Sequence, residues 1–259
     1  MGKGDLTPTA ITNNLGTRFI GQRVIYYPRL KSTMDVARRQ AQQGAAEGTA
    51  VIAGEQTAGR GRRQRAWLSP KGSIALSIIL YPELGYLSSL IMVASLAVVH
   101  GIEQVTGLKP QIKWPNDVLI NNKKVCGILV ESEVKGNRVG YAIIGIGLNV
   151  NLNLSDLPEI SSIATSLSQE LGRNVSQLDI IRCLLAEIER LYLSLPSGDS
   201  VFQEWRKKLA TLGKRVQISS DKTVYDGVAE SVAGDGSLML RQSDGSLTKI
   251  VAGDVTLLK

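Results

Sequence analysis

Four arginines within six positions are the most chemically suggestive feature of the chain. They occupy positions 60, 62, 63 and 65 of the segment Gly59-Arg60-Gly61-Arg62-Arg63-Gln64-Arg65-Ala66-Trp67. Arginine binds carboxylate and phosphate oxygens through paired hydrogen bonds, and glycine lets the backbone approach a ligand closely. The segment is neither a Walker A loop nor a G-x-G-x-x-G dinucleotide fingerprint. We expect an irregular anion-binding loop that is mobile without ligand; a solvated basic loop and an Arg-Gly nucleic-acid patch remain open.

A second polar segment interrupts two apolar stretches. Lys113-Trp114-Pro115-Asn116-Asp117 is followed by Asn121-Asn122-Lys123-Lys124 and then by Val125-Cys126-Gly127-Ile128-Leu129-Val130-Glu131. Lys124 lies three positions before a glycine that leaves space beside it, so its amine can reach into a cavity. For Lys123 we favour a solvated turn, and for Cys126 a small packing residue.

Composition indicates an ordinary globular protein. The chain has 259 residues, 43% hydrophobic and 20% charged, with a net charge of +7 and a pI of about 9.4. This balance argues against wholesale disorder and is compatible with anionic partners. One histidine and two cysteines offer neither a disulfide framework nor a zinc set. No secretory signal or membrane-length apolar run is evident, so we expect a cytoplasmic protein.

Hydrophobic periodicity predicts an α+β fold with a mixed, largely antiparallel central sheet flanked by helices. Polar turns at 121–124 and 135–137 indicate antiparallel hairpins. Ser32-x-x-Asp35 has the form of a helix start in which the serine oxygen caps the helix. Glycine-rich turns between short strands after residue 213 indicate a small β-barrel. The expected strands are 23–27, 49–56, 73–80, 112–114, 118–120, 125–134 and 138–148, and the expected helices are 32–44, 86–105, 176–195 and 201–212. The predicted parts are a disordered leader (1–22), a catalytic domain (23–212) and the barrel (213–259).

Taken together, these motifs resemble the biotin–protein ligase family. Gly145-Ile146-Gly147-Leu148-Asn149-Val150-Asn151 and Ala164-Thr165-Ser166-Leu167 follow the two polar segments in the family's order. The resemblance implies a class II synthetase-like catalytic domain with an SH3-like C-terminal barrel. It also implies a two-step reaction, in which biotin and MgATP form biotinyl-5′-AMP and the biotinyl group then passes to a lysine of a carboxyl carrier domain of acetyl-CoA carboxylase or a related carboxylase.

The resemblance also assigns roles to individual residues. It implies that Arg60, Arg62 and Lys124 are catalytic, that no residue of this chain acts as a nucleophile, and that Mg²⁺ binds through the phosphates near Asp117. Met34 stands where the family has asparagine. The implied biotin contacts are Ser32, Thr33, Met34, Gln56, Arg60, Gly61, Arg62, Lys124 and Gly127. The implied nucleotide contacts are Arg62, Arg65, Trp67, Asn116, Asp117, Lys124 and Asn149.

Two other functions and several partner questions stay open at this point. A lipoate or octanoate ligase or transferase would share the same fold, and a nucleic-acid-binding module would use the basic loop without catalysis. About twenty residues precede the first expected strand, too few for a helix-turn-helix domain, so we expect no DNA operator binding. The short apolar runs also lead us to expect no membrane association. A homodimer formed through the edge of the central sheet is left open.

Overall fold

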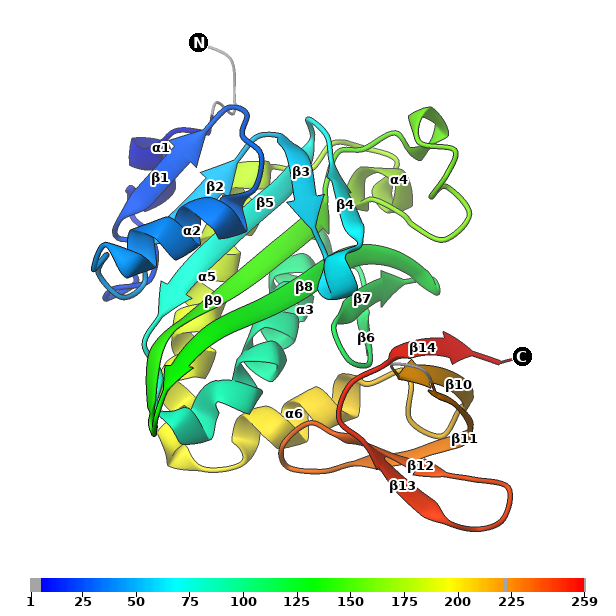
Figure 1. The fold of residues 1–259 in the computed structure, drawn as a ribbon. Helices are drawn as coiled ribbons and strands as arrows, with labels where there is room; N and C mark the ends of the chain where they lie inside the picture. Colours follow the sequence, from blue (N-terminus) through cyan, green and yellow to red (C-terminus); the bar gives the residue numbers. More distant parts are fainter. Residues whose placement is uncertain (1–5, 221–222, 259) are drawn as a thin grey trace.

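The computed structural model describes residues 6–220 and 223–258 and is built around a seven-stranded sheet (Figure 1). The β1–β2 pair is parallel and every other pair in this sheet is antiparallel, which confirms the predicted mixed sheet. All eight residues of β5 are buried, as expected for a strand covered on both faces. In spatial order the strands are β1 (Val24–Tyr27), β2 (Ala50–Ala53), β5 (Ser73–Leu80), β9 (Arg138–Asn149), β8 (Lys123–Lys135), β7 (Asp117–Ile120) and β6 (Gln111–Lys113).

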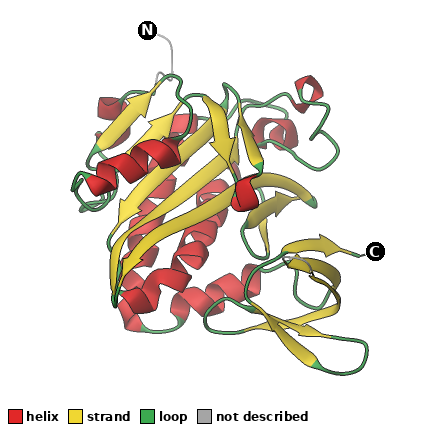
Figure 2. Cartoon of the chain, in the orientation of Figure 1, coloured by secondary structure: helices red, strands yellow, loops and turns green. Residues whose placement is uncertain are grey.

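Helices cover both faces of this sheet (Figure 2). The 3₁₀ segment η2 (Leu84–Ser89) leads into α3 (Leu90–Thr106), which packs with α5 (Gln177–Ser194) on one face, while α2 (Thr33–Gln42) lies on the other. The expectation of no membrane-length apolar run is wrong for Leu84–Thr106, which is long and apolar enough to cross a membrane, although most of this stretch is buried in the core of the fold. The remaining helical segments are α1 (Pro8–Thr12), η3 (Leu154–Asp156), α4 (Leu167–Leu171), η4 (Leu195–Ser197) and α6 (Ser200–Lys208).

The C-terminal part forms a separate five-stranded antiparallel sheet. Its spatial order is β13, β12, β11, β10, β14. One contact between the two parts is a hydrogen bond in which the Trp114 indole Nε1, next to β6, donates to the Gly236 carbonyl, just before β12, at 2.8 Å. Its strands are β10 (Arg215–Ser220), β11 (Thr223–Val232), β12 (Leu238–Arg241), β13 (Leu247–Ile250) and β14 (Asp254–Leu257).

The N-terminal segment departs from the prediction. Residues 6–22 are packed onto the catalytic part, so the expectation of a disordered leader is wrong for them, whereas residues 1–5 lie outside the described chain. Ile11 and Ile20 are fully buried. The Glu189 carboxylate accepts hydrogen bonds from three successive backbone N–H groups, those of Arg18, Phe19 and Ile20, at 2.6, 2.8 and 2.9 Å. Apolar burial and these charge-assisted bonds together offset the entropy cost of ordering the segment.

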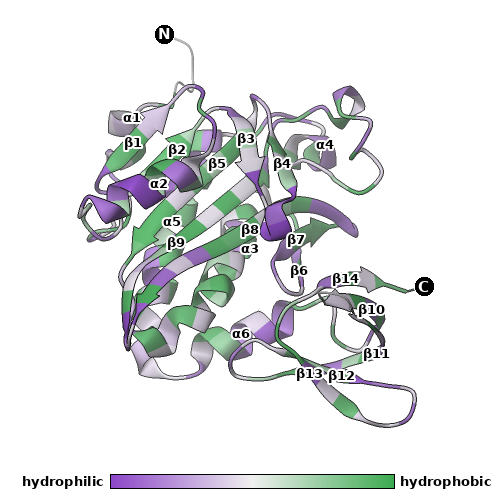
Figure 3. Cartoon of the chain, in the orientation of Figure 1, coloured by the Kyte–Doolittle hydropathy of each residue, from purple (hydrophilic) through white to green (hydrophobic). Residues whose placement is uncertain are grey.

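The arginine-rich segment folds as a β-hairpin instead of an irregular loop. Strand β3 (Gln56–Arg60) pairs antiparallel with β4 (Ala66–Ser69), and the 3₁₀ turn η1 (Arg62–Gln64) forms the tip. The expected strand 49–56 therefore breaks after Ala53, and the hairpin begins at Gln56. Figure 3 shows hydrophobic residues concentrated in the central sheet and a hydrophilic tip on this hairpin, which crosses the sheet beside β8. The expected helix 201–212 ends earlier, at Lys208.

Two asparagines make the β7–β8 connection a tight turn. Asn121 and Asn122 both adopt positive φ angles, 50° and 63°, as a two-residue type I′ hairpin requires. Lys123 and Lys124 consequently belong to β8 instead of the turn. Since side chains alternate along a strand, the turn fixes which of the two lysines faces the arginine hairpin formed by β3 and β4.

Candidate active site

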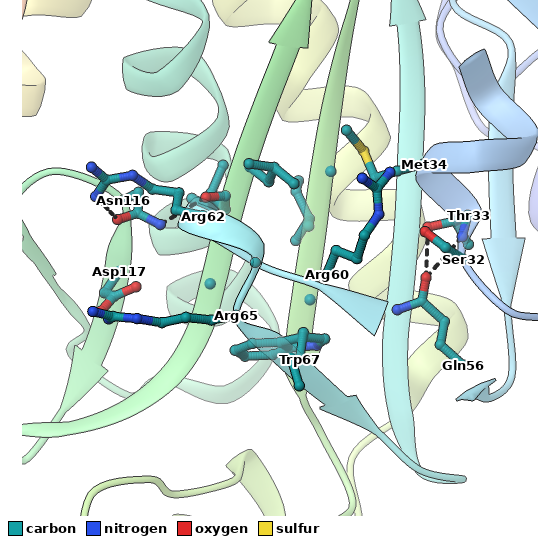
Figure 4. Close-up of a pocket in the computed structure, with 18 of the residues that line it drawn as sticks. Ser32, Thr33, Met34, Gln56, Arg60, Arg62, Arg65, Trp67, Asn116 and Asp117 are labelled. Carbon is teal, nitrogen blue, oxygen red and sulfur yellow. Dashed lines mark hydrogen bonds between the residues drawn. The ribbon is translucent and has the colours of Figure 1, made fainter. Parts of the chain in front are cut away.

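A cavity of about 150 Å³ lies beneath the arginine hairpin (Figure 4). Its walls come from the start of α2, from β3 and β4, from the central strands β7, β8 and β9, and from the start of β14. The lining residues are Ser32, Thr33, Met34, Gln56, Arg60, Gly61, Arg62, Arg65, Ala66, Trp67, Asn116, Asp117, Lys124, Gly127, Ile128, Leu129, Gly145, Ile146, Gly147 and Asp254. The structure thus brings together every residue predicted for the site except Asn149.

Polar groups at the start of α2 form one end of the cavity. Gln56 Oε1 accepts hydrogen bonds from the Thr33 backbone N–H and hydroxyl at 2.8 and 3.0 Å. The Ser77 hydroxyl donates to Thr33 Oγ1 at 2.8 Å, which fixes this corner from the sheet. Ser32 is at the helix N-cap position, but its side chain makes no capping bond within the described chain, so the predicted capping role is wrong. Its buried hydroxyl lies beside the cavity and is free to bind a ligand.

The base of the hairpin is held by carboxylates from outside it. Arg60 Nη2 lies 2.6 Å from Asp35 Oδ1 on α2, and Arg60 Nη1 lies 3.8 Å from Glu131 Oε1 on β8. Arg38, also on α2, pairs with both carboxylates.

The tip of the hairpin is held by the C-terminal sheet. Arg62 Nη1 donates to Asn116 Oδ1 at 2.9 Å and to the Gly253 carbonyl at 3.2 Å. Arg63 and Arg65 pair with Asp254 of β14 at 3.3 and 2.6 Å. Carboxylates and carbonyls from distant elements thus compensate the repulsion among the arginines, while the expected mobility of this segment without ligand stays a prediction.

Trp67 and Lys124 occupy the middle of the cavity. Lys124 Nζ lies 2.6 Å from Asp117 Oδ1 and 5.2 Å from the centre of the Trp67 ring, a distance at which a cation and an aromatic face attract. The indole packs against Gly127 and Gly147 of the two central strands, where a side chain would collide with it. These glycines provide the space in which the indole and the lysine amine meet.

Three buried polar atoms at the cavity have unused hydrogen-bonding capacity. Within residues 6–220 and 223–258, the buried side-chain atoms without a hydrogen-bond partner are Ser32 Oγ, Arg60 Nε, Trp67 Nε1 and Trp205 Nε1. The first three belong to residues that line the cavity. Leaving a buried donor unpaired costs about 1–3 kcal/mol, so a cluster of such donors at one cavity indicates a ligand with oxygen acceptors.

Burial also shifts the pKa values of two cations and of a nearby thiol. Desolvation lowers the pKa of Arg62 and of Lys113 from their ordinary values, because burial disfavours the charged form. An anion that approaches these groups therefore meets cations that are poorly solvated by water. Burial raises the pKa of the Cys126 thiol, so this cysteine is protonated at neutral pH and is a poor nucleophile.

Comparison with known proteins identifies the family. Residues 26–149 match the Biotin/lipoate A/B protein ligase family and residues 211–258 match the Biotin protein ligase C terminal domain. The chain is 37% identical over 260 residues to the Bifunctional ligase/repressor BirA of Bacillus subtilis, covering 98% of this chain and 80% of that protein. The chain belongs to the biotin/lipoate ligase family.

Other relatives agree with this assignment. The Biotin--[acetyl-CoA-carboxylase] ligase of Paracoccus denitrificans is 32% identical over 207 residues, which is 75% of this chain and 85% of that protein. The structure of the biotin protein ligase from Aquifex aeolicus in complex with biotin and ATP superposes with a TM-score of 0.78 at 27% identity, covering 92% of this chain and 99% of that one. The predicted family and fold class are confirmed.

One residue predicted to contact the nucleotide, Asn149, does not line the cavity. Asn149 is buried beyond the cavity and donates from Nδ2 to the Thr165 carbonyl at 3.0 Å. Thr165 in turn donates its N–H to the Lys124 carbonyl at 2.8 Å. Asn149 therefore supports the backbone of Lys124 through Thr165, and its predicted contact with the nucleotide stays a prediction.

Several lining residues were not predicted for the site. Gly145 and Gly147 belong to a predicted motif but were given no role. On β9, Gly147 faces Trp67 of the hairpin and Gly145 faces Met34 of α2, and a larger side chain at either position would collide with these residues. Asp254 could not be found from local sequence, because it looks like an ordinary turn residue of the C-terminal sheet and meets the arginines only in the folded chain.

Proposed function

We propose that this chain joins biotin to ATP, releases pyrophosphate, and passes the biotinyl group from biotinyl-5′-AMP to a lysine of a carrier protein. The observation that carries the proposal is the convergence of Arg60, Arg62 and Lys124 with unpartnered buried donors on one cavity. Family membership and the biotin ligases among its relatives support the same reaction.

The polar corner suits the uncharged ureido head of biotin. Ser32 Oγ has hydrogen-bonding capacity to spare, while Thr33 and Gln56 are fixed by each other. Met34 and Leu129 provide apolar surface beside this corner for the thiophane ring and the valeryl chain. A tail that extends from this corner along the cavity leads its carboxylate toward Lys124.

The first chemical step brings two anions together. A carboxylate oxygen of biotin forms a bond to the α-phosphorus of ATP as the bond to the pyrophosphate oxygen breaks. Lys124 and the arginines offset the repulsion between carboxylate and phosphate and the charge that develops in the transition state. Mg²⁺ bound with the phosphates would neutralise further charge, and Asp117 is the carboxylate placed to hold it at the wall of the cavity.

The nucleotide end of the cavity lies between the hairpin tip and β7. Arg62, Arg65 and Asn116 offer donors and acceptors to the phosphates and ribose, and Trp67 offers an aromatic face to the adenine. The cavity volume of about 150 Å³ is below the roughly 300–1,000 Å³ of ordinary ligand pockets. We propose that Trp67 and the hairpin shift outward to admit both substrates and then close over them, which would exclude water from the reactive anhydride.

The second step needs no nucleophile from this chain. The amine of the acceptor lysine attacks the acyl carbon of biotinyl-5′-AMP, an amide bond forms, and AMP leaves. The mixed anhydride is already activated, and the protonated Cys126 is not required. We propose a carboxyl carrier domain of acetyl-CoA carboxylase or a related carboxylase as the acceptor and the cytoplasm as the compartment, where the two free cysteines stay reduced.

ATP–pyrophosphate exchange tests the proposal directly. We expect exchange that depends on biotin and not on lipoate, followed by biotin transfer to a purified carrier domain. Lys124→Ala should lower the exchange rate by about 10²–10³-fold, as removal of one charge-stabilising donor does elsewhere. The matched control is Lys123→Ala, since the neighbouring lysine does not line the cavity.

The variants also separate binding from chemistry. We expect Arg62→Gly to retain adenylate formation but to release biotinyl-5′-AMP faster, because Arg62 contacts Asn116 and Gly253 at the nucleotide end. Exchange that requires lipoate would instead assign a lipoate ligase. Salt-dependent binding of nucleic acid with no exchange would assign a binding module.

A further inference from the structure

Four charged side chains from three elements form a closed network beside the cavity. Asp35 and Arg38 come from α2, Arg60 ends β3, and Glu131 lies on β8. Asp35 Oδ1 lies 2.6 Å from Arg60 Nη2 and 3.3 Å from Arg38 Nη1. Glu131 pairs closely with Arg38 through Nη2 and reaches Arg60 Nη1 at 3.8 Å. Two cations and two carboxylates thus compensate each other.

Only one member of this network faces the substrates. Arg60 lines the cavity, whereas the other three lie behind it. In Figure 4 the Arg60 side chain rises from the end of β3 toward Met34 on α2, away from the tip arginines. Both of its terminal nitrogens are directed to carboxylates, and its Nε is buried without a partner in the described chain.

Arg60 is hydrogen-bonded to Asp35 at Nη2, and its Nη1 lies within ion-pair distance of Glu131, so both carboxylates favour one orientation of the guanidinium plane. The five N–H groups of a guanidinium form a rigid fork, so contacts at Nη1 and Nη2 also fix the direction of the Nε–H bond. Glu131 is placed for this task by strand alternation, because Gly127 and Leu129 on the same face of β8 line the cavity and Glu131 follows two residues later. Asp35 approaches from the opposite element, the first turn of α2.

The network contributes little to stability as ordinary ion pairs. The side chains of its members keep 28–39% of their surface exposed, and pairs of this exposure are typically worth 0–1 kcal/mol. A structural role alone therefore predicts a small effect on folding and no selective effect on substrate use.

We propose that Asp35 and Glu131 are positioning residues, which orient Arg60 so that its Nε–H donates to the carboxylate oxygen of the biotin tail. The proposal rests on the proposed function of the cavity. Arg38 acts behind them as the counter-charge that offsets the repulsion between the two carboxylates and ties α2 to β8. The arginine hairpin is thereby fixed at its base by this network and at its tip by Asp254.

Steady-state exchange kinetics of the full chain test the positioning role. We expect Asp35→Asn to lower kcat/KM for biotin about five- to tenfold while the KM for ATP stays within twofold. Glu131→Gln should have a smaller effect, since its contact with Arg60 is 3.8 Å instead of 2.6 Å. Asp35→Glu, which keeps the charge, should recover most of the loss.

The matched control is Glu133→Gln, two residues farther along β8. Glu133 pairs with Lys135 at 2.8 Å and does not line the cavity, so its loss should leave the kinetics unchanged. Asp35→Asn should also melt within about 2 °C of the unaltered chain, as expected for an exposed ion pair.

A double-mutant cycle identifies the residue through which Asp35 acts. In an Arg60→Lys background, where the planar fork is absent, Asp35→Asn should cause no further loss. Unchanged biotin kinetics in Asp35→Asn, or losses that add fully in the cycle, would overturn the positioning role. If the unaltered chain showed no biotin-dependent exchange, the proposed function would fail and this inference with it, so the two failures are distinguishable.

Discussion

Replacing Gly147 by alanine is the sharpest test of how the cavity is built. An alanine methyl group at this position would lie 2.3 Å from Trp67 Nε1 and 2.4 Å from Cε2. Non-bonded carbon atoms prefer about 3.5–4.0 Å, so the indole has to withdraw by roughly 1 Å or more. Strand β9 is hydrogen-bonded between β5 and β8 and has little freedom to move. The hairpin that carries Trp67 must yield instead.

The displacement of the indole should lower the exchange rate strongly and the stability of the fold only slightly. A misplacement of about 1 Å in a reacting site costs up to about 10²-fold in rate, so we expect Gly147→Ala to lower biotin-dependent exchange by about 10–10²-fold. Overpacking typically costs about 1–3 kcal/mol, and each kcal/mol shifts Tm by about 2–4 °C in a chain of this size. Because the hairpin can yield, we expect the lower end of that range.

Exchange assays and thermal melts test this prediction on Gly147→Ala, on a control variant, and on Gly147→Ala in a second background. Gly85→Ala is the matched control, since a methyl group there meets no atom within 4 Å. In a Trp67→Ala background the methyl group has space, so Gly147→Ala should cause no further loss. A Gly147→Ala enzyme with an unaltered exchange rate would refute the inference that the space above Gly147 is needed when the hairpin closes over the substrates.

Three further predictions concern contacts away from the reacting atoms. Asp254→Asn should release the hairpin tip and let trypsin cut after Arg65 up to about fivefold faster, as loss of an exposed ion pair allows; equal cleavage rates would contradict this anchoring. Glu189→Gln should lower the free energy of unfolding by about 1–3 kcal/mol, seen as a Tm lower by several degrees, because an amide nitrogen would face backbone donors. Lys249 and the N–H of Ser237 lower the pKa of Asp235 from 3.8 to about 2. The ionised carboxylate therefore stabilises the fold above about pH 4, and this stabilisation is lost as the pH falls toward 2. The difference in Tm between the unaltered chain and Asp235→Asn should narrow over the same pH range.

Local patterns were sufficient to predict most of the sheet and its helices. Alternation and turn residues identified the β8–β9 hairpin, and the end of the expected helix 86–105 lies one residue before the end of α3, which Gly107 caps. The predicted ends of strands and helices were wrong where contacts with distant parts of the chain determine them. The expected strand 49–56 breaks at Gly54, whose Cβ position would collide with the Pro28 carbonyl at 2.8 Å, a contact that no local pattern contains.

The arginine hairpin shows why local charge was misleading. Counting only its own residues, four cations between glycines repel one another and predict an irregular mobile loop. The compensating carboxylates come from Asp35, Glu131 and Asp254, the last of which is 189 positions from Arg65. Each of these acids looks like an ordinary solvated residue in its own segment. Sequence motifs could therefore identify groups that line the cavity, while the carboxylates that hold the arginines in place became visible only in the folded chain.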